Sequence, residues 1–142
     1  MTTEIFLRSF QEWANDESAI EAVGVVGSHA RGTARPDSDV DLVILATPSD
    51  LYLGDNHWLS RFGDVQEVRN EPYGLVQSKR AFYTSSLEVE YGFATDRWFE
   101  TNPINDGTLK VIAGGCEILV DKNGRFSKLL EALKVFRTAQ LT

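Results

Sequence analysis

The chain has 142 residues, of which 42% are hydrophobic and 25% are charged. These values are ordinary for one globular domain with an apolar core, so we expect a single domain over residues 1–142. The formal net charge of −7 argues against DNA or RNA as a partner, because affinity for nucleic acid depends mostly on Lys and Arg contacts to phosphates.

The cysteine content and the lengths of the apolar runs indicate in which cellular compartment the protein resides. Cys116 is the only cysteine, so no intrachain disulfide can form. The first residues lack the basic and apolar regions of a signal peptide, and no apolar run reaches transmembrane length. We therefore expect a cytoplasmic protein that does not contact a membrane.

The N-terminal segment predicts a helix followed by a strand. The helix is expected to begin with Thr2 or Thr3 as its cap and to end within residues 15–18. Its apolar positions recur at helical spacing: Phe6, Phe10, Trp13 and Ala14. The run 22–26 is short, apolar and β-branched, which predicts a buried strand that ends at Gly27.

The next segment combines a turn of small residues with two carboxylates. Gly27 allows the backbone to approach a ligand closely, Ser28 offers a hydroxyl, and residues 30–34 can open a helix whose free N–H groups attract phosphate. Asp39 and Asp41 are two residues apart, so in a strand they point the same way. Neighbouring carboxylates repel unless a cation or a proton lies between them, and oxygen ligands suit Mg²⁺ bridging to a phosphate. The segment predicts a metal–triphosphate site and phosphoryl or nucleotidyl transfer.

The middle of the chain predicts a helical stretch and then an antiparallel meander. Gly63 closes the helical stretch, which begins near residue 48 and has His57 on its surface. Its apolar side is formed by Leu51, Trp58, Leu59 and Phe62. The meander has period-two segments at residues 65–70, 75–84 and 87–94, separated by turns at residues 71–74 and 85–86.

The third meander segment carries two acids on one face. Glu88 and Glu90 share that face with the small residues Gly92 and Ala94, and the opposite face is apolar. Acids beside small residues predict a pocket, and an outward-facing strand with solvated glutamates is the alternative.

Three side chains near this segment have two interpretations each. Lys79 and Arg80 alternate faces, so only one of them can point to the pocket. Trp98 either stacks on a base or lies in the core, and the core is the favoured interpretation.

The last third of the chain predicts a cap or turn at residues 106–107, a short helix at 109–113, a strand at 116–120 and a turn at 121–124. A closing amphipathic helix follows, with its apolar positions at Phe126, Leu129, Leu130, Leu133 and Phe136. This apolar side packs on the core or, alternatively, forms a homodimer face.

The run GSHARGTARPDSDVDLVIL at residues 27–45 resembles the signature of the DNA polymerase beta-like nucleotidyltransferase superfamily. It is most similar to that of the minimal nucleotidyltransferases and the aminoglycoside adenylyltransferases. The resemblance implies an α/β (α+β) fold with a mixed, mainly antiparallel sheet flanked by helices. It also implies ATP as the donor and two Mg²⁺ ions as cofactors.

The resemblance implies which residues form the site. Asp39 and Asp41 would be catalytic metal ligands, joined by a third carboxylate on a later strand. Glu90 fits that place best and Glu88 is the rival, although the family more often has aspartate there. Glu90 would also help to activate an acceptor hydroxyl.

The resemblance also implies the nucleotide contacts, expected from Gly27, Ser28, Arg31 and Ser38. Ser28 and nearby backbone N–H groups would contact the triphosphate. Arg31 either neutralises phosphate charge or lies on the helix surface, and Ser38 braces the loop before Asp39. We do not expect His29 to be a general base, because no orienting partner lies near it in sequence.

Three functions stay open at this point. The first is Mg²⁺-dependent transfer of AMP from ATP to a hydroxyl of a small molecule or a protein, with a homodimer or an open site holding the acceptor. The second is an antitoxin-like minimal nucleotidyltransferase that acts on a helical toxin partner. The third is a non-catalytic nucleotide-binding or protein-binding module, against which the intact Asp39 and Asp41 weigh.

Overall fold

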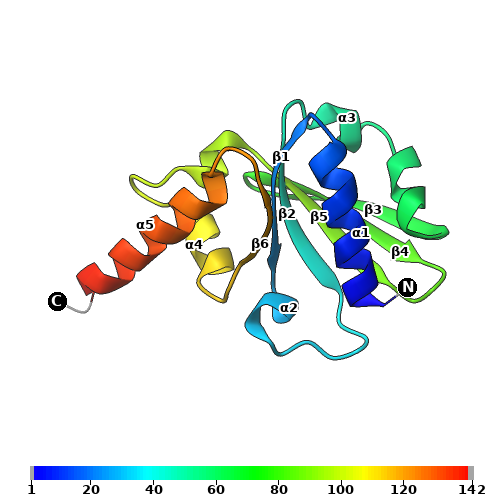
Figure 1. Ribbon diagram of the computed structural model, residues 1–142, viewed down its shortest axis with the longest axis horizontal. Coiled ribbons are helices and arrows are strands. Elements are labelled where there is room, and N and C mark those ends of the chain that lie inside the picture. The colour runs from blue at the N-terminus through cyan, green and yellow to red at the C-terminus, as the bar shows by residue number, and fades with distance from the viewer. Residues whose placement is uncertain (1, 141–142) are drawn as a thin grey trace.

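The computed structural model describes residues 2–140 and contains a six-stranded sheet with helices on both faces (Figure 1). The strands are β1 (Ile20–Val26), β2 (Val40–Ala46), β3 (Val65–Tyr73), β4 (Val76–Tyr83), β5 (Glu88–Ala94) and β6 (Glu117–Asp121). Their order in the sheet is β3-β4-β5-β2-β1-β6. The β2–β5 pair is parallel and the other four neighbouring pairs are antiparallel, which confirms the expected mixed, mainly antiparallel sheet.

The two faces of the sheet are covered by different helices (Figure 1). The helical elements are α1 (Thr3–Asp16), α2 (Ser28–Arg31), α3 (Asp50–Leu53), η1 (His57–Phe62), η2 (Asp96–Phe99), α4 (Asp106–Ile112) and α5 (Arg125–Gln140). Residues of α1, α3 and η1 pack with Leu42 and Ile44 of β2, whereas residues of η2, α4 and α5 pack with Val43 and Leu45. The central strand β2 is therefore buried on both sides, which holds its N-terminal end in a fixed position.

The first helix forms as its sequence predicts. The Thr2 hydroxyl accepts the Ile5 backbone N–H at 3.2 Å, and the helix buries Phe6, Phe10 and Ala14. Rings from α1 pack edge-on or tilted against Phe62 and Tyr91. This packing fixes η1 and β5 against α1.

The stretch from residue 48 to Gly63 differs from the expected helix. It forms the short α3 and the 3₁₀ helix η1, and Leu51 is 57% exposed. Tyr52 is buried instead. Its polar atoms have partners in this buried position, because its hydroxyl donates to Glu17 at 2.8 Å and its carbonyl accepts the Trp58 indole N–H at 3.0 Å. The side chain of His57 is exposed, as expected.

Two element boundaries also differ from the sequence-based expectation. The helix placed at residues 30–34 is α2, which begins earlier, at Ser28, and ends at Arg31. Residues 71–73 continue strand β3 and do not form a turn. Pro72 is tolerated there because β3 is an edge strand, where the missing N–H removes no bond within the sheet.

The C-terminal part of the described chain follows the predicted pattern with small shifts. Trp98 is 3% exposed and lies in the core, as favoured. Helix α5 buries Phe126, Leu129 and Leu133, whereas Phe136 is 37% exposed. No helix among residues 2–140 is long and apolar enough to cross a membrane.

Candidate active site

The turn after β1 brings its backbone against a carboxylate of β2. Val26 lies opposite Asp41 in the β1–β2 register, and Gly27 follows with φ +73°. A Cβ atom at Gly27 would lie 2.3 Å from Asp41 Oδ2. Only glycine both adopts this left-handed conformation without strain and leaves room for the carboxylate.

Three carboxylates meet at the end of β2. The parallel β2–β5 register places Asp41 directly opposite Glu90, and Asp39 lies one residue before β2 begins. One oxygen from each of Asp39, Asp41 and Glu90 lies within 4.8 Å of the others. The structure thus brings together the three residues that the sequence proposed as metal ligands, and Glu88 is not in this group.

The electrostatics of Asp41 follow from this crowding. Burial, hydrogen bonding with Glu90 and the charge of Asp39 together raise the pKa of Asp41 from 3.8 to about 8. A cation among the three carboxylates would remove the repulsion. Their hard oxygen donors fit Mg²⁺ or Mn²⁺, so the residues present suit a divalent metal site.

Of the two neighbouring cations Lys79 and Arg80, it is Arg80 that faces this site. Arg80 lies opposite Glu90 in the β4–β5 register and its guanidinium reaches the carboxylates. Lys79 points to the other face, where it is buried and donates to the Asp55 carbonyl at 3.0 Å and to the Asn56 side chain. Burial lowers the pKa of Lys79.

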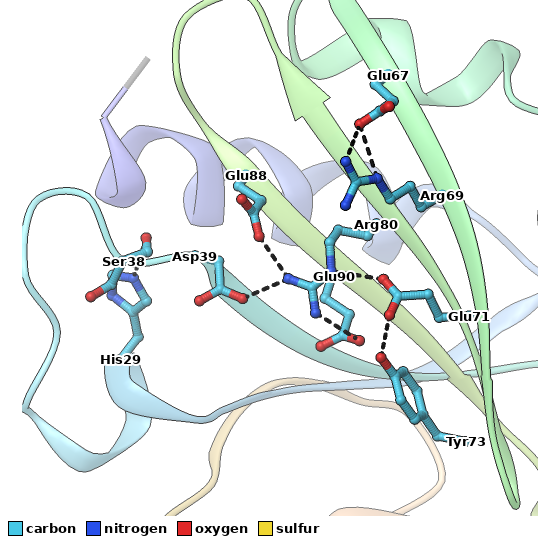
Figure 2. Close-up of polar contacts among 10 residues, drawn as sticks. All are labelled: His29, Ser38, Asp39, Glu67, Arg69, Glu71, Tyr73, Arg80, Glu88 and Glu90. Carbon is cyan, nitrogen blue, oxygen red and sulfur yellow. Dashed lines mark hydrogen bonds and ion pairs between the residues drawn. The ribbon is translucent and has the colours of Figure 1, made fainter.

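The Arg80 guanidinium contacts four carboxylates (Figure 2). The contacts are Nη1 to Asp39 Oδ2 at 3.0 Å, Nη1 to Glu88 Oε2 at 2.6 Å, Nε to Glu71 Oε1 at 2.9 Å and Nη2 to Glu90 Oε1 at 3.3 Å. Burial alone disfavours the charged guanidinium, but its hydrogen bonds with Glu71 and Glu88 prevail and raise the pKa of Arg80. Arg80 therefore stays charged throughout the usual pH range.

The loop before Asp39 is held by Ser38 and His29. The Ser38 hydroxyl accepts the Arg35 backbone N–H at 2.8 Å, and His29 Nε2 lies 3.4 Å from the Ser38 carbonyl oxygen (Figure 2). Ser38 thus braces this loop, as expected. A contact between Ser38 and a nucleotide stays a prediction.

A cavity of about 790 Å³ lies beside the carboxylates. Its lining includes Asp41, Arg80 and Glu90, together with the small residues Ser78 and Gly92. A pocket therefore lies beside Glu90 and Gly92 as predicted, whereas Glu88 and Ala94 do not line it. A Cβ atom at Gly92 would lie 2.9 Å from the Leu42 carbonyl oxygen, so glycine also permits the close β2–β5 pairing here.

Besides Arg80, two cationic side chains line the same cavity from different elements. Arg31 comes from α2 and Lys110 from α4. Among the ion pairs found within residues 2–140, neither side chain takes part. Lys110 had no signal in the sequence, because nothing in the periodicity of α4 shows that this helix lies beside the cavity.

Two solved structures illustrate how this fold compares with known ones. An aminoglycoside 6-adenyltransferase from Bacillus subtilis superposes with a TM-score of 0.54 at 14% identity, over 68% of this chain and 36% of that one. A cytoplasmic RNA terminal U-transferase gives a TM-score of 0.42 at 17% identity, over 63% and 28% of the two chains. The chain therefore spans about a third of the length of these proteins. The first likeness shows a shared fold.

Sequence comparison identifies the family. No curated protein sequence matches the chain significantly. The model of the nucleotidyltransferase domain matches residues 7–89, a segment that contains Gly27, Ser28, Asp39 and Asp41 and ends one residue before Glu90. Because this match covers more than half of the chain, the chain belongs to the nucleotidyltransferase domain family.

Proposed function

We propose that the chain transfers AMP from ATP, with Mg²⁺, to a hydroxyl group of a small molecule or a protein. The observation that carries this proposal is the group formed by Asp39, Asp41 and Glu90, of which Asp41 and Glu90 line the 790 Å³ cavity. Membership of the nucleotidyltransferase domain family supports nucleotidyl transfer as the reaction class. The choice of ATP rests on the sequence resemblance to adenylyltransferases.

The proposed roles divide the site into a metal side and a phosphate side. Asp39, Asp41 and Glu90 would hold two Mg²⁺ ions. When bound, these ions would activate the acceptor hydroxyl and stabilise charge on the attacking and leaving oxygens. Gly27 keeps the turn clear for Asp41, because it has no Cβ atom to occupy the place of the carboxylate.

The phosphate side uses the turn after β1 and two of the cationic side chains that line the cavity. Ser28 is the first residue of α2, and the first N–H groups of a helix have no intrahelical partner. We propose that these groups and the Ser28 hydroxyl bind the triphosphate. Arg31 and Lys110, which line the cavity, would neutralise its charge.

The reaction is an in-line displacement at the α-phosphorus. The acceptor oxygen forms a bond to that phosphorus, the bond from it to the oxygen bridging the β-phosphorus breaks, and pyrophosphate leaves with the bonding electron pair. Glu90 helps to remove the proton of the acceptor hydroxyl. In the product, AMP is joined to the acceptor oxygen by an ester linkage.

The charge of the chain bears on the acceptor. The net charge is −7, and Glu71 and Glu88 add negative charge beside the three proposed metal ligands. A neutral or cationic acceptor suits these surroundings better than a polyanion does. The aminoglycoside named for the similar structure is an acceptor of this kind.

The test follows radioactive AMP from α-labelled ATP. The intact chain is incubated with Mg²⁺ and the labelled nucleotide, once with a panel of aminoglycosides and once with a cell extract, and label is measured in small-molecule and protein fractions. We expect Mg²⁺-dependent label in one fraction and none with the Asp41→Asn variant. Label that persists in EDTA or in this variant would refute the proposed site.

A further inference from the structure

The guanidinium of Arg80 engages two kinds of carboxylate at once. Asp39 and Glu90 belong to the proposed metal-binding group, whereas Glu71 and Glu88 do not. All three nitrogens of the guanidinium are used, and Nη1 contacts one carboxylate of each kind, Asp39 and Glu88 (Figure 2). Asp41, the third member of the metal-binding group, has no ion pair with it within residues 2–140.

The position of Arg80 is fixed from both sides. Its backbone is paired with Glu90 on β5 and with Arg69 on β3, so β4 is an inner strand here. Glu71 is itself held by the Tyr73 hydroxyl, which donates to it. A planar group with five donors can satisfy four carboxylates at once, which an ammonium with three donors cannot do.

The charges around Arg80 explain what it does when no metal is bound. Its four partners and Asp41 form a group of five acidic side chains around one guanidinium. Without this cation the carboxylates would repel one another at close range, which would destabilise the metal-free fold. A divalent ion would provide the same neutralisation, and it needs oxygens of Asp39 and Glu90 that Arg80 already contacts.

We propose that Arg80 is a positioning residue that competes with the divalent ion: it holds Asp39 and Glu90 in the metal-free chain and yields them to the ion, while Glu71 and Glu88 retain it. This inference rests on the metal site of the proposed function. It assigns Glu71 and Glu88 the task of keeping the guanidinium beside the site. Arg80 thereby sets the metal affinity without being a ligand.

The experiment measures binding of Mn²⁺ alone to the intact chain by calorimetry, without nucleotide or acceptor. Arg80→Met should bind Mn²⁺ about tenfold more tightly than the wild type, because a competing positive charge is lost. The same variant should melt at a lower temperature in EDTA. Arg80→Lys should lie between the two in affinity, since it keeps the charge with fewer contacts.

Arg69→Met is the matched control for the loss of charge. Arg69 lies opposite Arg80 in the β3–β4 register, but it pairs with Glu67 (Figure 2). Both side chains of this pair are more exposed than Arg80 and its four carboxylate partners. This variant should bind Mn²⁺ as the wild type does. Equal or weaker binding by Arg80→Met, or tightening by Arg69→Met of the same size, would overturn the proposal.

A second variant decides the question if Arg80→Met does not fold. Glu88→Gln removes a partner that retains Arg80, so the guanidinium should bind Asp39 and Glu90 more strongly and weaken Mn²⁺ binding about threefold. Glu67→Gln is its control and should have no effect. Unchanged or tighter binding by Glu88→Gln would overturn the proposal, and no Mn²⁺ binding by the wild type would refute the metal site of the proposed function as well.

Discussion

Asp39 directly precedes β2 and Asp41 is its second residue, and the apolar residues of this strand, not the two aspartates, fill the core. Both side chains are only partly buried, whereas Leu42 and Ile44 are almost fully buried. Replacing either carboxylate by an amide should therefore preserve the fold. We expect Asp39→Asn and Asp41→Asn to lower nucleotidyl transfer by at least about a thousandfold, with an unchanged circular dichroism spectrum. Near-normal turnover by either variant would contradict the metal role.

The raised pKa of Asp41 predicts how metal-free stability depends on pH. Because its pKa is raised from 3.8 to about 8, the folded chain keeps this proton in a range where the unfolded chain has lost it. This difference destabilises the wild type progressively as pH rises from about 4 to 8. The amide that replaces this carboxyl in the Asp41→Asn variant does not titrate. In EDTA, Asp41→Asn and the wild type should melt at similar temperatures at pH 4.5, and the variant should melt at increasingly higher temperatures than the wild type as the pH approaches 8. A difference in melting temperature that does not change with pH would contradict the assignment of this effect to Asp41.

Glu88 and Glu90 can be distinguished by matched substitutions. Glu90 shares the metal-binding group with the two aspartates, whereas Glu88 contacts Arg80 from outside that group. Glu90→Gln should lower transfer as strongly as the aspartate variants do, and Glu88→Gln should lower it less than about tenfold. The opposite order in a labelled-AMP assay would move the third carboxylate to position 88.

The residues of the site differ in how far the sequence reveals them. Gly27, Ser28 and the two aspartates lie within one short segment, so their spacing alone indicates shared chemistry. Arg80 and Lys110 approach the cavity only through the β4–β5 register and the placement of α4. Local periodicity determines neither the strand register nor the placement of α4. The sequence therefore predicts Arg80 only as one of two candidates, and it does not predict Lys110.

At the scale of elements, β1 packs against α5 through a glycine. A Cβ atom at Gly24 would lie 2.8 Å from Phe126 Cζ, and the Phe126 ring is fully buried against Phe99. The ring cannot move without disturbing this cluster. Gly24→Ala should therefore lower the free energy of unfolding by about 1–3 kcal/mol in urea denaturation.

Gly107→Ala is the control for that substitution. Gly107 lies in α4, and a Cβ atom added there would meet nothing within 4 Å beyond its chain neighbours and the nearby backbone of the helix. Alanine should leave the free energy of unfolding equal or raise it by up to about 1 kcal/mol, because it is the better helix former. A loss of stability as large as that of Gly24→Ala would show that packing at Phe126 is not the cause.

The elements that the sequence predicts well are those with one clear periodicity. Helix α1 and the two faces of β5 follow from it directly. Residues 48–63 do not, because the buried position is Tyr52, whose hydroxyl needs Glu17, just after α1, as a partner that local sequence does not show. Likewise, Pro72 resembles a turn signal, and only the edge position of β3 explains why a strand continues through it.

At the scale of the whole molecule, ligand binding should couple to stability. If Mg²⁺ and ATP bind the folded chain alone, the free energy of unfolding rises by about 2.7 kcal/mol when free ligand is a hundred times the dissociation constant. The melting temperature should rise accordingly, more with ATP than with GTP or CTP. Asp41→Asn should lose most of this rise. An equal rise in melting temperature for the variant and the wild type would show that Asp41 is not part of the nucleotide site.

The parallel pairing of β2 with β5 also determines when, during folding, the site comes into existence. Asp41 and Glu90 are opposite one another in the sheet but about fifty residues apart along the chain, with the β3–β4 hairpin between them. A hairpin closes within microseconds, whereas a pairing of this kind must first overcome the entropy of closing a long loop. In the early chain a cation therefore meets Asp39 and Asp41 without Glu90. We expect the cation to stabilise the protein mainly by slowing the unfolding of the finished sheet and not by speeding its formation.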